Sequence, residues 1–288
     1  MSTEITTAFV KQFTNGITLL QQQMGSNLRE GVSVESNITG DRAFFDQVDA
    51  TAMSQITTRH GDTDLTDTPH RRRMVTIAPY DVADLVDRAD QIRTLNDPTN
   101  AYVRSFAAAA GRSIDDVIIS AYAATAATGV DGSGSDAFDS DFTIVHGSAG
   151  LSTTKIVEAR SILEAAENPE DGGDNQWYLV CNAQGRRDLL EDTQFENSDF
   201  NSIKALVRGE VDTWLGFKFL KSERLPTDGT TTDLFAWRKQ SMKLAVGCEP
   251  RGFIDVLPGK RHSTQVRYEL DIGAVRMDQK GVVKIEIQ

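Results

Sequence analysis

Lysine is nearly absent from the first half of this 288-residue chain. It occurs at Lys11 and next at Lys155, and the ten basic residues between these two positions are all arginine. Positive charge is also in the minority overall, because 30 Lys and Arg face 42 Asp and Glu and give a net charge of −12. This balance excludes a mainly basic nucleic-acid-binding module and attachment to membranes through a polybasic segment, since both need clustered Lys and Arg.

Cysteine is equally scarce, with only Cys181 and Cys248. Two cysteines cannot form a disulfide framework or a CxxC metal site, so a reducing environment is the simple interpretation. No apolar run approaches the ~18 residues of a membrane span, and the polar first residues do not resemble a secretory signal. We therefore expect a soluble protein that stays in the cytosol and does not contact a membrane.

Histidine is too sparse and too scattered for a helical zinc site. None of the four histidines forms an i, i+4 pair, and an HExxH sequence is absent. His60 and His70 could meet Asp62 around a metal ion, but hydrogen bonds that shape a loop are the favoured interpretation. The carboxylates of residues 131–141 lack the glycine and glutamate positions of a calcium-binding loop, so a solvated loop is expected there. We predict no metal site.

Two short sequences resemble catalytic or cofactor motifs but are incomplete. Gly132-Ser133-Gly134 lacks the third glycine of a dinucleotide-binding loop, and it follows a predicted helix instead of a strand. His146-Gly147-Ser148 lacks the glycine two residues before the serine that a nucleophile elbow requires. An enzyme built on His146 and Ser148, or on the His60, Asp62 and His70 group, is left as a rival hypothesis. The sequence itself predicts no catalytic residue and no cofactor.

The chain begins with an amphipathic segment. Its apolar residues recur every three or four positions, which predicts one stripe along a helix: Ile5, Phe9, Phe13, Ile17, Leu20, Met24 and Leu28. Residues 31–43 are polar and punctuated by glycine, so nothing adjacent in the sequence covers this stripe. Packing on the protein's own core and packing on a neighbouring subunit are both open.

Residues 44–78 predict an extended β-hairpin with a long polar tip. Turn residues are flanked by Ile56 and by the apolar residues 74–77. Such a hairpin with little apolar content is hard to explain in a monomer and makes sense if something else covers it. Arg71, Arg72 and Arg73 follow the tip, and the nearby acids at positions 62, 64 and 67 favour carboxylate pairing within or between subunits over phosphate binding.

The rest of the chain predicts helices first and strands last. Helices are expected at 82–95 after Asp81 as N-cap, from Pro98 to Gly111, from Ser113 to about Gly129, at 153–167 after Ser152, and near 184–191. The second and third could be one long helix bent at Gly111. Strands are expected at 142–145, 177–181, 207–220, 234–237, 242–246, 265–275 and 282–287. The predicted fold class is α+β.

Several short sequences then follow one another in a fixed order. They are TTRHGDT at 57–63, TPHRRRMV at 68–75, KALVRGE at 204–210, TWLGFK at 213–218, STQV at 263–266, GAVRM at 273–277 and GVV at 281–283. In this order they resemble the major capsid proteins of tailed double-stranded-DNA bacteriophages, which have the Hong Kong 97-type fold. The resemblance extends over essentially the whole chain.

The resemblance implies a division of the chain into parts. Residues 1–37 would be an N-terminal arm, 38–78 the E-loop, 79–150 the peripheral domain with a spine helix at about 97–129, 151–255 the axial domain, and 256–288 strands that return to the peripheral domain. The arm and the E-loop would contact neighbouring subunits. The implied candidates for those contacts are Phe9, Phe13, Ile17, Leu20, Arg59, His60, Asp62, His70, Arg71, Arg72 and Arg73.

The resemblance also implies a function and partners. The protein would self-assemble through hexamers and pentamers into the icosahedral head of a virion, formed in the host cytoplasm around double-stranded DNA that it binds without sequence specificity. A portal, a separate scaffolding protein and a decoration or cementing protein are the other implied partners. Because the E-loop contains no lysine, the isopeptide crosslink of the type member has no nucleophile here. An encapsulin-like compartment shell that holds a protein cargo is the alternative with the same fold.

Overall fold

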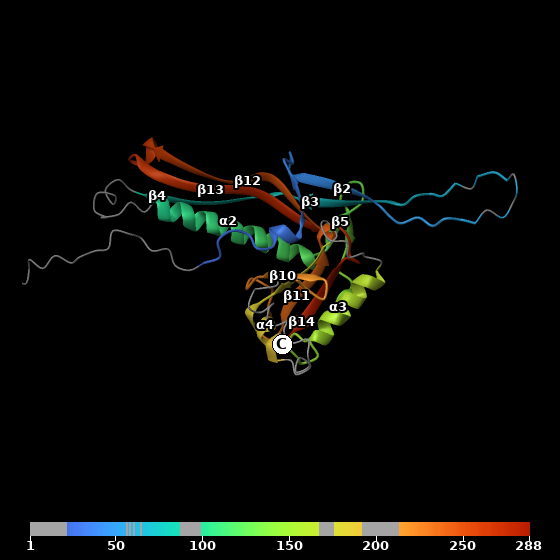
Figure 1. Ribbon diagram of the computed structural model, residues 1–288. Helices are drawn as coiled ribbons and strands as arrows, with labels where there is room; N and C mark the ends of the chain where they lie inside the picture. The colour runs from blue at the N-terminus through green and yellow to red at the C-terminus, as the bar shows by residue number, and fades with distance from the viewer. Residues whose placement is uncertain are drawn as a thin grey trace, which may run out of the picture. The chain divides into compact units, whose positions relative to one another are not determined.

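The computed structural model describes residues 22–55, 57, 59, 61–63, 65–86, 99–166, 176–191 and 213–288 (Figure 1). The chain divides into two compact units. The smaller contains residues 1–25, 80–112 and 250–270, and the larger contains residues 26–79, 113–249 and 271–288. Helices and several sheets occur together, so the predicted α+β class is confirmed.

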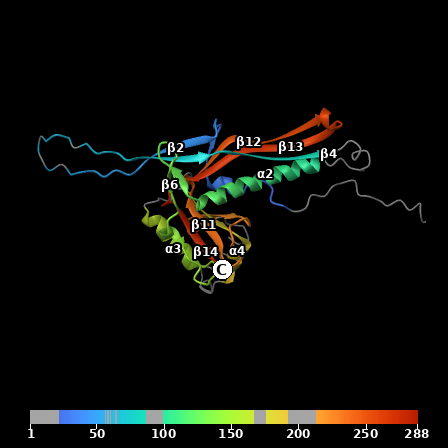
Figure 2. The same cartoon turned by 180° about the vertical axis from the view of Figure 1, so that it is seen from behind.

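A six-stranded sheet is the centre of the larger unit, with the strand order β7-β14-β11-β8-β10-β9. Its strands are β7 (Thr143–Ile144), β8 (Trp177–Cys181), β9 (Thr213–Trp214), β10 (Phe217–Lys221), β11 (Thr232–Arg238) and β14 (Val282–Ile287). The predicted strand at 177–181 is confirmed and is buried at every position, as expected of a strand with neighbours on both sides. Helices α3 (Thr153–Ala165) and α4 (Ala183–Glu191) flank this sheet (Figure 2).

Both flanking helices begin close to where the sequence predicts. The hydroxyl of Ser152 accepts a hydrogen bond from the backbone N–H of Lys155, which is the expected N-cap of α3. The Lys155 ammonium turns inward and donates to the carbonyls of His146, Ala149 and Glu286 at 2.9–3.0 Å. Burial lowers the pKa of Lys155. This lysine therefore ties the loop before α3 to strand β14.

Aromatic rings fill the interior beside this sheet. The ring of Tyr122 lies 4.8 Å from Phe235 and 4.7 Å from Trp237, measured between centroids. The Trp237 indole donates a 2.7 Å hydrogen bond to the carbonyl of Gly31, at the end of the short helix η2 (Arg29–Gly31). A side chain at position 31 would meet the Trp237 ring at 2.8 Å, so only glycine permits this approach.

The segment before η2 is held by a buried acid. One carboxylate oxygen of Asp115 accepts from the Ser26 hydroxyl at 2.5 Å and from the Leu28 backbone N–H at 3.1 Å, and the other accepts from the Asn27 N–H at 3.1 Å. Asp115 and Leu28 are both fully buried. The helical stripe predicted from Ile5 to Leu28 is therefore wrong in its described part, since residues 22–28 are not α-helical. Capture by Asp115 replaces the hydrogen bonds of a helix there. Residues 1–21 lie outside the described residues.

The predicted hairpin is confirmed in a second sheet with the order β2-β3-β5-β6. Its strands are β2 (Arg42–Val48), β3 (His70–Thr76), β5 (Ala126–Thr128) and β6 (Gly134–Asp136). Strands β2 and β3 are antiparallel, and the chain between them leaves the sheet as a long extended loop (Figure 1). Every described residue from 50 to 69 is exposed.

The third sheet has the order β1-β12-β13-β4. Its strands are β1 (Ser33–Ser36), β4 (Ala78–Val86), β12 (Met242–Leu257) and β13 (Ser263–Arg276), and the remaining short helices are η3 (Ser140–Phe142), η6 (Lys239–Ser241) and η7 (Pro258–Lys260). Within the smaller unit, Arg267 contacts Asp81 of β4 at 3.6 Å and Glu269 at 2.9 Å, and Arg251 of β12 contacts Glu269 at 3.0 Å. Alternating charges thus connect the three strands of this unit.

Strand β4 corrects the predicted helix at 82–95. Residues 78–86 are extended and lie at the edge of the sheet beside β13, and residues 87–98 lie outside the described residues. The spacing of Val82, Leu85 and Val86 fits a helical face, but Leu85 is 45% exposed whereas Val86 is buried. Pairing with β13 decides the conformation, because tertiary hydrogen bonds override a weak local preference.

Helix α2 (Thr99–Tyr122) continues through Gly111 and settles the open choice in favour of one long helix. It ends before the predicted Gly129, because residues 126–128 form β5. Ser113 is an interior residue of α2 and not an N-cap. Gly111 has a packing role: a methyl group there would lie 2.6 Å from the Cα of Gly25, which itself has a φ of +80°. In the described part of the chain, no helix has the length and apolarity needed to cross a membrane.

Substitution of Gly111 by alanine is expected to destabilise the protein by ~1–3 kcal/mol, because the added methyl overlaps the backbone of Gly25. In an unobstructed helix the same change stabilises by up to ~1 kcal/mol. A loss of unfolding free energy in G111A would therefore indicate the close contact with Gly25. Urea unfolding of G111A and of the exposed control Ser120→Ala measures it. A G111A protein that is more stable than the wild type would contradict the close approach.

The two cysteines are free thiols in different surroundings. Burial raises the pKa of Cys181 to about 12, whereas Cys248 is half-buried. Because the thiolate is the reactive form, we expect a maleimide or disulfide reagent at neutral pH to modify one thiol in the native chain and two after unfolding. Mass spectrometry should locate the native label at Cys248, and the Cys248→Ser variant should lose it. Rapid native labelling of Cys181 would refute this.

Candidate functional site

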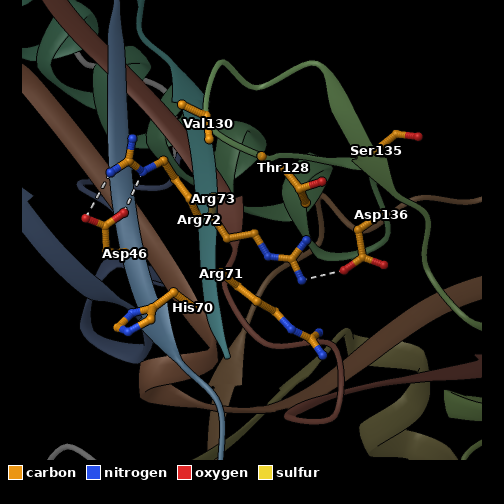
Figure 3. A pocket seen from close by; sticks show the side chains of 10 residues that line it. Asp46, His70, Arg71, Arg72, Arg73, Thr128, Val130, Ser135 and Asp136 are labelled. Atoms are coloured by element: carbon orange, nitrogen blue, oxygen red, sulfur yellow. Dashed lines mark hydrogen bonds and ion pairs between the residues drawn. The ribbon is translucent and has the colours of Figure 1, made fainter. Parts of the chain in front are cut away.

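The most prominent polar site of the larger unit lies on strand β3, where His70, Arg71, Arg72 and Arg73 are consecutive. Side chains alternate along a strand, so Arg71 and Arg73 lie on one side of β3 while His70 and Arg72 lie on the other (Figure 3). The strand pairs with β2 along its whole length, but with β5 only at Arg73 and Met74. The three arginines therefore lie on the part of β3 at which its pairing with β5 ends.

Arg72 pairs with Asp46, its cross-strand neighbour on β2. Its Nε lies 2.5 Å from one carboxylate oxygen of Asp46 and its Nη2 lies 3.2 Å from the other, and its guanidinium lies 5.7 Å from the centroid of the Phe44 ring. The hydrogen bond from Arg72 holds the pKa of Asp46 below its usual range. Both side chains are exposed, and such surface pairs contribute little to stability.

Arg73 points the other way and is 3% exposed. Its Nε donates to the carbonyl of Met277 at 3.1 Å, and its Nη2 donates to the carboxylate of Asp136 on β6. Its Nη1 is enclosed and has no hydrogen-bond partner. This guanidinium joins the hairpin strand to two segments more than 60 residues away in the chain.

Arg276 lies behind this pair and is fully buried. One of its nitrogens donates to the carbonyls of Tyr122 and Ala124, both at 2.8 Å, and another donates to the carbonyl of Asp136 at 3.1 Å. Its guanidinium also lies 5.1 Å from the centroid of the Phe138 ring. Burial lowers the pKa of Arg276. Arg276 thus fixes the end of α2 to the β5–β6 hairpin.

An open hollow of about 790 Å³ lies beside β3. Its lining residues are Asp46, His70, Arg71, Arg72, Arg73, Thr128, Gly129, Val130, Ser135 and Asp136 (Figure 3). Arg71 reaches it from the strand edge, with its Nε 2.6 Å from a carboxylate oxygen of Asp49. The hollow is thus lined by arginines, by carboxylates that pair with two of them, and by hydroxyl residues.

The structure confirms carboxylate pairing of the three arginines and corrects the partners. The acids are Asp49, Asp46 and Asp136 and not those at 62 and 67, while residue 64 lies outside the described residues. Residues at 62 and 67 lie in the loop, which leads away from the strands. The hairpin register places Asp46 opposite Arg72, and Asp49 follows at the end of β2, where its carboxylate contacts Arg71.

The other predicted site residues fall into two groups. Arg59, Asp62 and His70 are exposed on the loop or at its root. The residues outside the described part of the chain are Phe9, Phe13, Ile17, Leu20 and His60.

The sequence does not reveal the importance of Arg276 and Asp115, since a buried arginine in a strand and an acid within a helix carry no local signal. Asp116 on α2 pairs with Arg224.

The segments that resemble catalytic and calcium-binding motifs make hydrogen bonds that stabilise local turns and a helix end. The His146 Nδ1 accepts a 3.0 Å hydrogen bond from the backbone N–H of Ser148, which closes a turn with Ser148 at a φ of +57°. Asp139 caps the helix η3 through the N–H of Asp141. Among the described residues, no group of three His, Cys, Asp or Glu side chains is arranged to hold a metal ion.

The model of a phage capsid protein family matches residues 5–288 of the chain. The chain belongs to the phage capsid protein family. Solved structures of phage proteins have the same fold. The capsid of cyanophage Pam1 has a TM-score of 0.74 at 15% identity, over 98% of this chain and 97% of that one. For Mycobacterium phage Che8 the values are 0.70 and 15%, over 96% of each chain.

A third relative is the capsid of a native GTA particle, with a TM-score of 0.71 at 13% identity over 99% of this chain and 97% of that one. A comparison with curated protein sequences finds no match. The capsid protein therefore has the Hong Kong 97-type fold that the sequence resemblance implies. Its β3 arginines belong to a structural protein, which is consistent with a site made of ion pairs and backbone contacts.

Proposed function

We propose that this chain is the major capsid protein of a tailed phage and self-assembles into an icosahedral shell around a double-stranded DNA genome. The observation that carries the proposal is the family match over residues 5–288. The fold of solved phage capsids over the same length supports it. The proposed role is structural and non-enzymatic, and the protein works by geometry: one fold repeats around closed symmetric contacts.

The hairpin loop supplies a physical reason for self-association. Met53 is 100% exposed and Leu65 is 95% exposed, although both are large apolar side chains. Their burial against another copy is worth ~1.5–3 kcal/mol each. We assign residues 38–78 to the E-loop and propose that Arg59, His60, Asp62, His70 and the three arginines contribute to subunit contacts. An interface above ~1,000 Å² is expected.

The remaining divisions stay proposals. Residues 1–37 are assigned to the arm, which would use Phe9, Phe13, Ile17 and Leu20 against a neighbour. The peripheral domain would take residues 79–150, and the axial domain residues 151–255. Strand β14 lies between β7 and β11 in the six-stranded sheet, so the last strand of the segment 256–288 shares a sheet with strands assigned to the axial domain.

The shell is proposed to be non-covalent. No lysine lies between Lys11 and Lys155, so residues 38–78 offer no amine for an isopeptide bond. Denaturing gels of mature particles should therefore show a monomer band near the chain mass of 31.6 kDa. Boiling in detergent with a reductant should leave no higher bands. A ladder of covalent oligomers would contradict the non-covalent shell.

Assembly in the host cytoplasm would need further partners. We propose a separate scaffolding protein, a portal, and a decoration or cementing protein that reinforces the shell. The packaged DNA would be enclosed without sequence-specific binding, which agrees with the net charge of −12.

The contents of nuclease-treated particles test the proposal against an encapsulin-like compartment. A phage capsid should protect double-stranded DNA of one genome length, whereas a compartment shell should contain one protein cargo and no long DNA. Deproteinised particles run on an agarose gel, and denaturing gels of the same particles, give both readings. Particles with a stoichiometric protein cargo and no protected DNA would contradict the phage function.

A further inference from the structure

Strand β2 forms a free edge of the second sheet. It is the first strand in the order β2-β3-β5-β6, and among the described residues it pairs with β3 alone (Figure 1). It is seven residues long and contains neither proline nor lysine, two residues that are common on edges that must not pair. Such an edge presents a row of unpaired backbone groups to which another extended strand can bind.

The backbone groups that face this edge belong to alternate residues. Two hydrogen bonds fix the phase at the ends of the strand: the Ile77 N–H donates to the Asp41 carbonyl, and the Asp49 N–H donates to the Pro69 carbonyl. In an antiparallel pair every second residue exchanges hydrogen bonds with the partner strand. The odd-numbered residues of β2 therefore bond to β3, and the N–H and C=O groups of the even-numbered residues point toward the free edge.

The even-numbered residues also carry the exposed side chains of β2. Phe44 is 42% exposed, and Arg42 and Asp46 are exposed charged residues on the same face of the strand. Ala43 and Phe45 pack against the core instead. The free edge therefore offers an aromatic ring with a positive charge two residues before it and a negative charge two residues after it.

This pattern is complementary to itself. If two copies of β2 run antiparallel with Phe44 opposite Phe44, Arg42 of each copy lies opposite Asp46 of the other. The directly opposed residues are then the ones whose backbone groups face the edge, as a hydrogen-bonded ladder requires. Opposite charges and aromatic rings directly across a ladder are favourable, whereas like charges are unfavourable. A shift of one strand by two residues in either direction removes both charge pairs.

We propose that two copies of this chain join through their β2 edges around a two-fold axis at Phe44. The same patch then serves both copies, as in any two-fold contact. Asp46 keeps its contact with Arg72, because a carboxylate has further acceptor positions for Arg42 of the second copy. The contact of Arg42 with Asp41 is 3.6 Å long, which leaves its donors available. The inference needs only two copies of the chain and does not rest on the proposed shell.

A covalent trap tests this contact, because one short strand pair is smaller than the ~1,000 Å² of a stable interface. In the proposed register the Cα atoms of the two Phe44 residues lie ~5.5 Å apart, a separation that a disulfide can span. All variants carry Cys248→Ser, so the introduced thiol is the accessible one and Cys181 stays buried. Under mild oxidation, full-length Phe44→Cys should form a disulfide-linked dimer.

Val48→Cys is the matched control. Val48 lies on the same face of β2 and is more exposed than Phe44, but its two copies would lie roughly 25 Å apart in this register. The Phe44→Cys dimer should therefore form ~10-fold or more faster, since the control positions cannot be bridged without movement of the backbone. Arg42→Cys and Asp46→Cys identify the register: each alone should give little dimer, and their mixture should give the heterodimer.

Non-reducing gels and mass spectrometry measure the linked species in the purified chain and in assembled particles. Equal rates for Phe44→Cys and Val48→Cys in both preparations would overturn the proposal, because they would show random collision. A mixture of Arg42→Cys and Asp46→Cys without excess heterodimer would overturn the register. The substituted side chains are exposed, so the core stays intact, and circular dichroism checks the folding of each variant. Closed particles without the Phe44 link would leave the shell proposal standing and remove only this contact.

Discussion

The Arg276→Ala variant is expected to lose ~3–5 kcal/mol of unfolding free energy, because three backbone carbonyls lose a charged donor at ~1–3 kcal/mol each. The guanidinium is fully buried and donates to three carbonyls, those of Tyr122, Ala124 and Asp136. Alanine removes the Arg276 donors from these carbonyls and opens a cavity at the end of α2. Urea denaturation monitored by tryptophan fluorescence measures the loss.

Two further variants separate the causes. Arg276→Lys keeps the charge but cannot supply the same planar set of donors, so an intermediate loss is expected. Arg42→Ala removes an exposed arginine whose contact with Asp41 is 3.6 Å long, and it should change stability by less than ~0.5 kcal/mol. An Arg276→Ala loss below ~1 kcal/mol, the scale of an average substitution, would show that the carbonyls find other partners.

Shortening the long hairpin is expected to abolish shell assembly and to leave the subunit folded. Residues 50–68 are replaced by Asn-Gly, which favours a tight turn, while the backbone bond from the Asp49 N–H to the Pro69 carbonyl is kept. Every described residue in this stretch is exposed, so its removal costs little core packing. A shorter loop also lowers the entropy cost of closure slightly.

Thermal unfolding and electron microscopy of the same preparation give the two readings. The unfolding midpoint should stay close to that of the wild type, and closed shells should be absent. A loop of the same length with its residues in scrambled order serves as the control for length alone. Shells of normal size from the Asn-Gly variant would contradict the role proposed for residues 38–78.

Strands buried on both sides were the easiest elements to predict. The apolar run at 177–181 predicts a central strand, because five consecutive buried residues fit such a strand and form too short a segment for a helix. Ser152 likewise identifies the start of α3, because an N-cap is a local interaction between neighbouring residues. Both features depend on a few consecutive residues.

Elements that depend on distant partners were harder to predict. Residues 78–86 have a helix-like spacing of apolar residues, yet they pair with β13, almost 200 residues later in the chain. Residues 22–28 continue a helical stripe, but the carboxylate of Asp115 takes up their backbone groups. No local pattern indicates either partner.

The candidate site shows the same limit. The run from His70 to Arg73 is visible in the sequence, which favours carboxylate pairing for the arginines. The partners follow from the hairpin register and from the approach of β6, which places Asp46, Asp49 and Asp136 beside the strand. In the sequence, Arg276 is visible only as part of the motif at 273–277, because nothing in its neighbourhood distinguishes a buried arginine from an exposed one.

Negative-stain electron microscopy of the purified protein tests the central claim most directly. If this chain forms the phage shell, the particles should be closed and should share one diameter, with hexamers and pentamers visible on the surface. If the chain alone gives only capsomers, the experiment is repeated with the proposed scaffolding protein co-expressed. A protein that stays monomeric or forms irregular aggregates under both conditions would contradict the account.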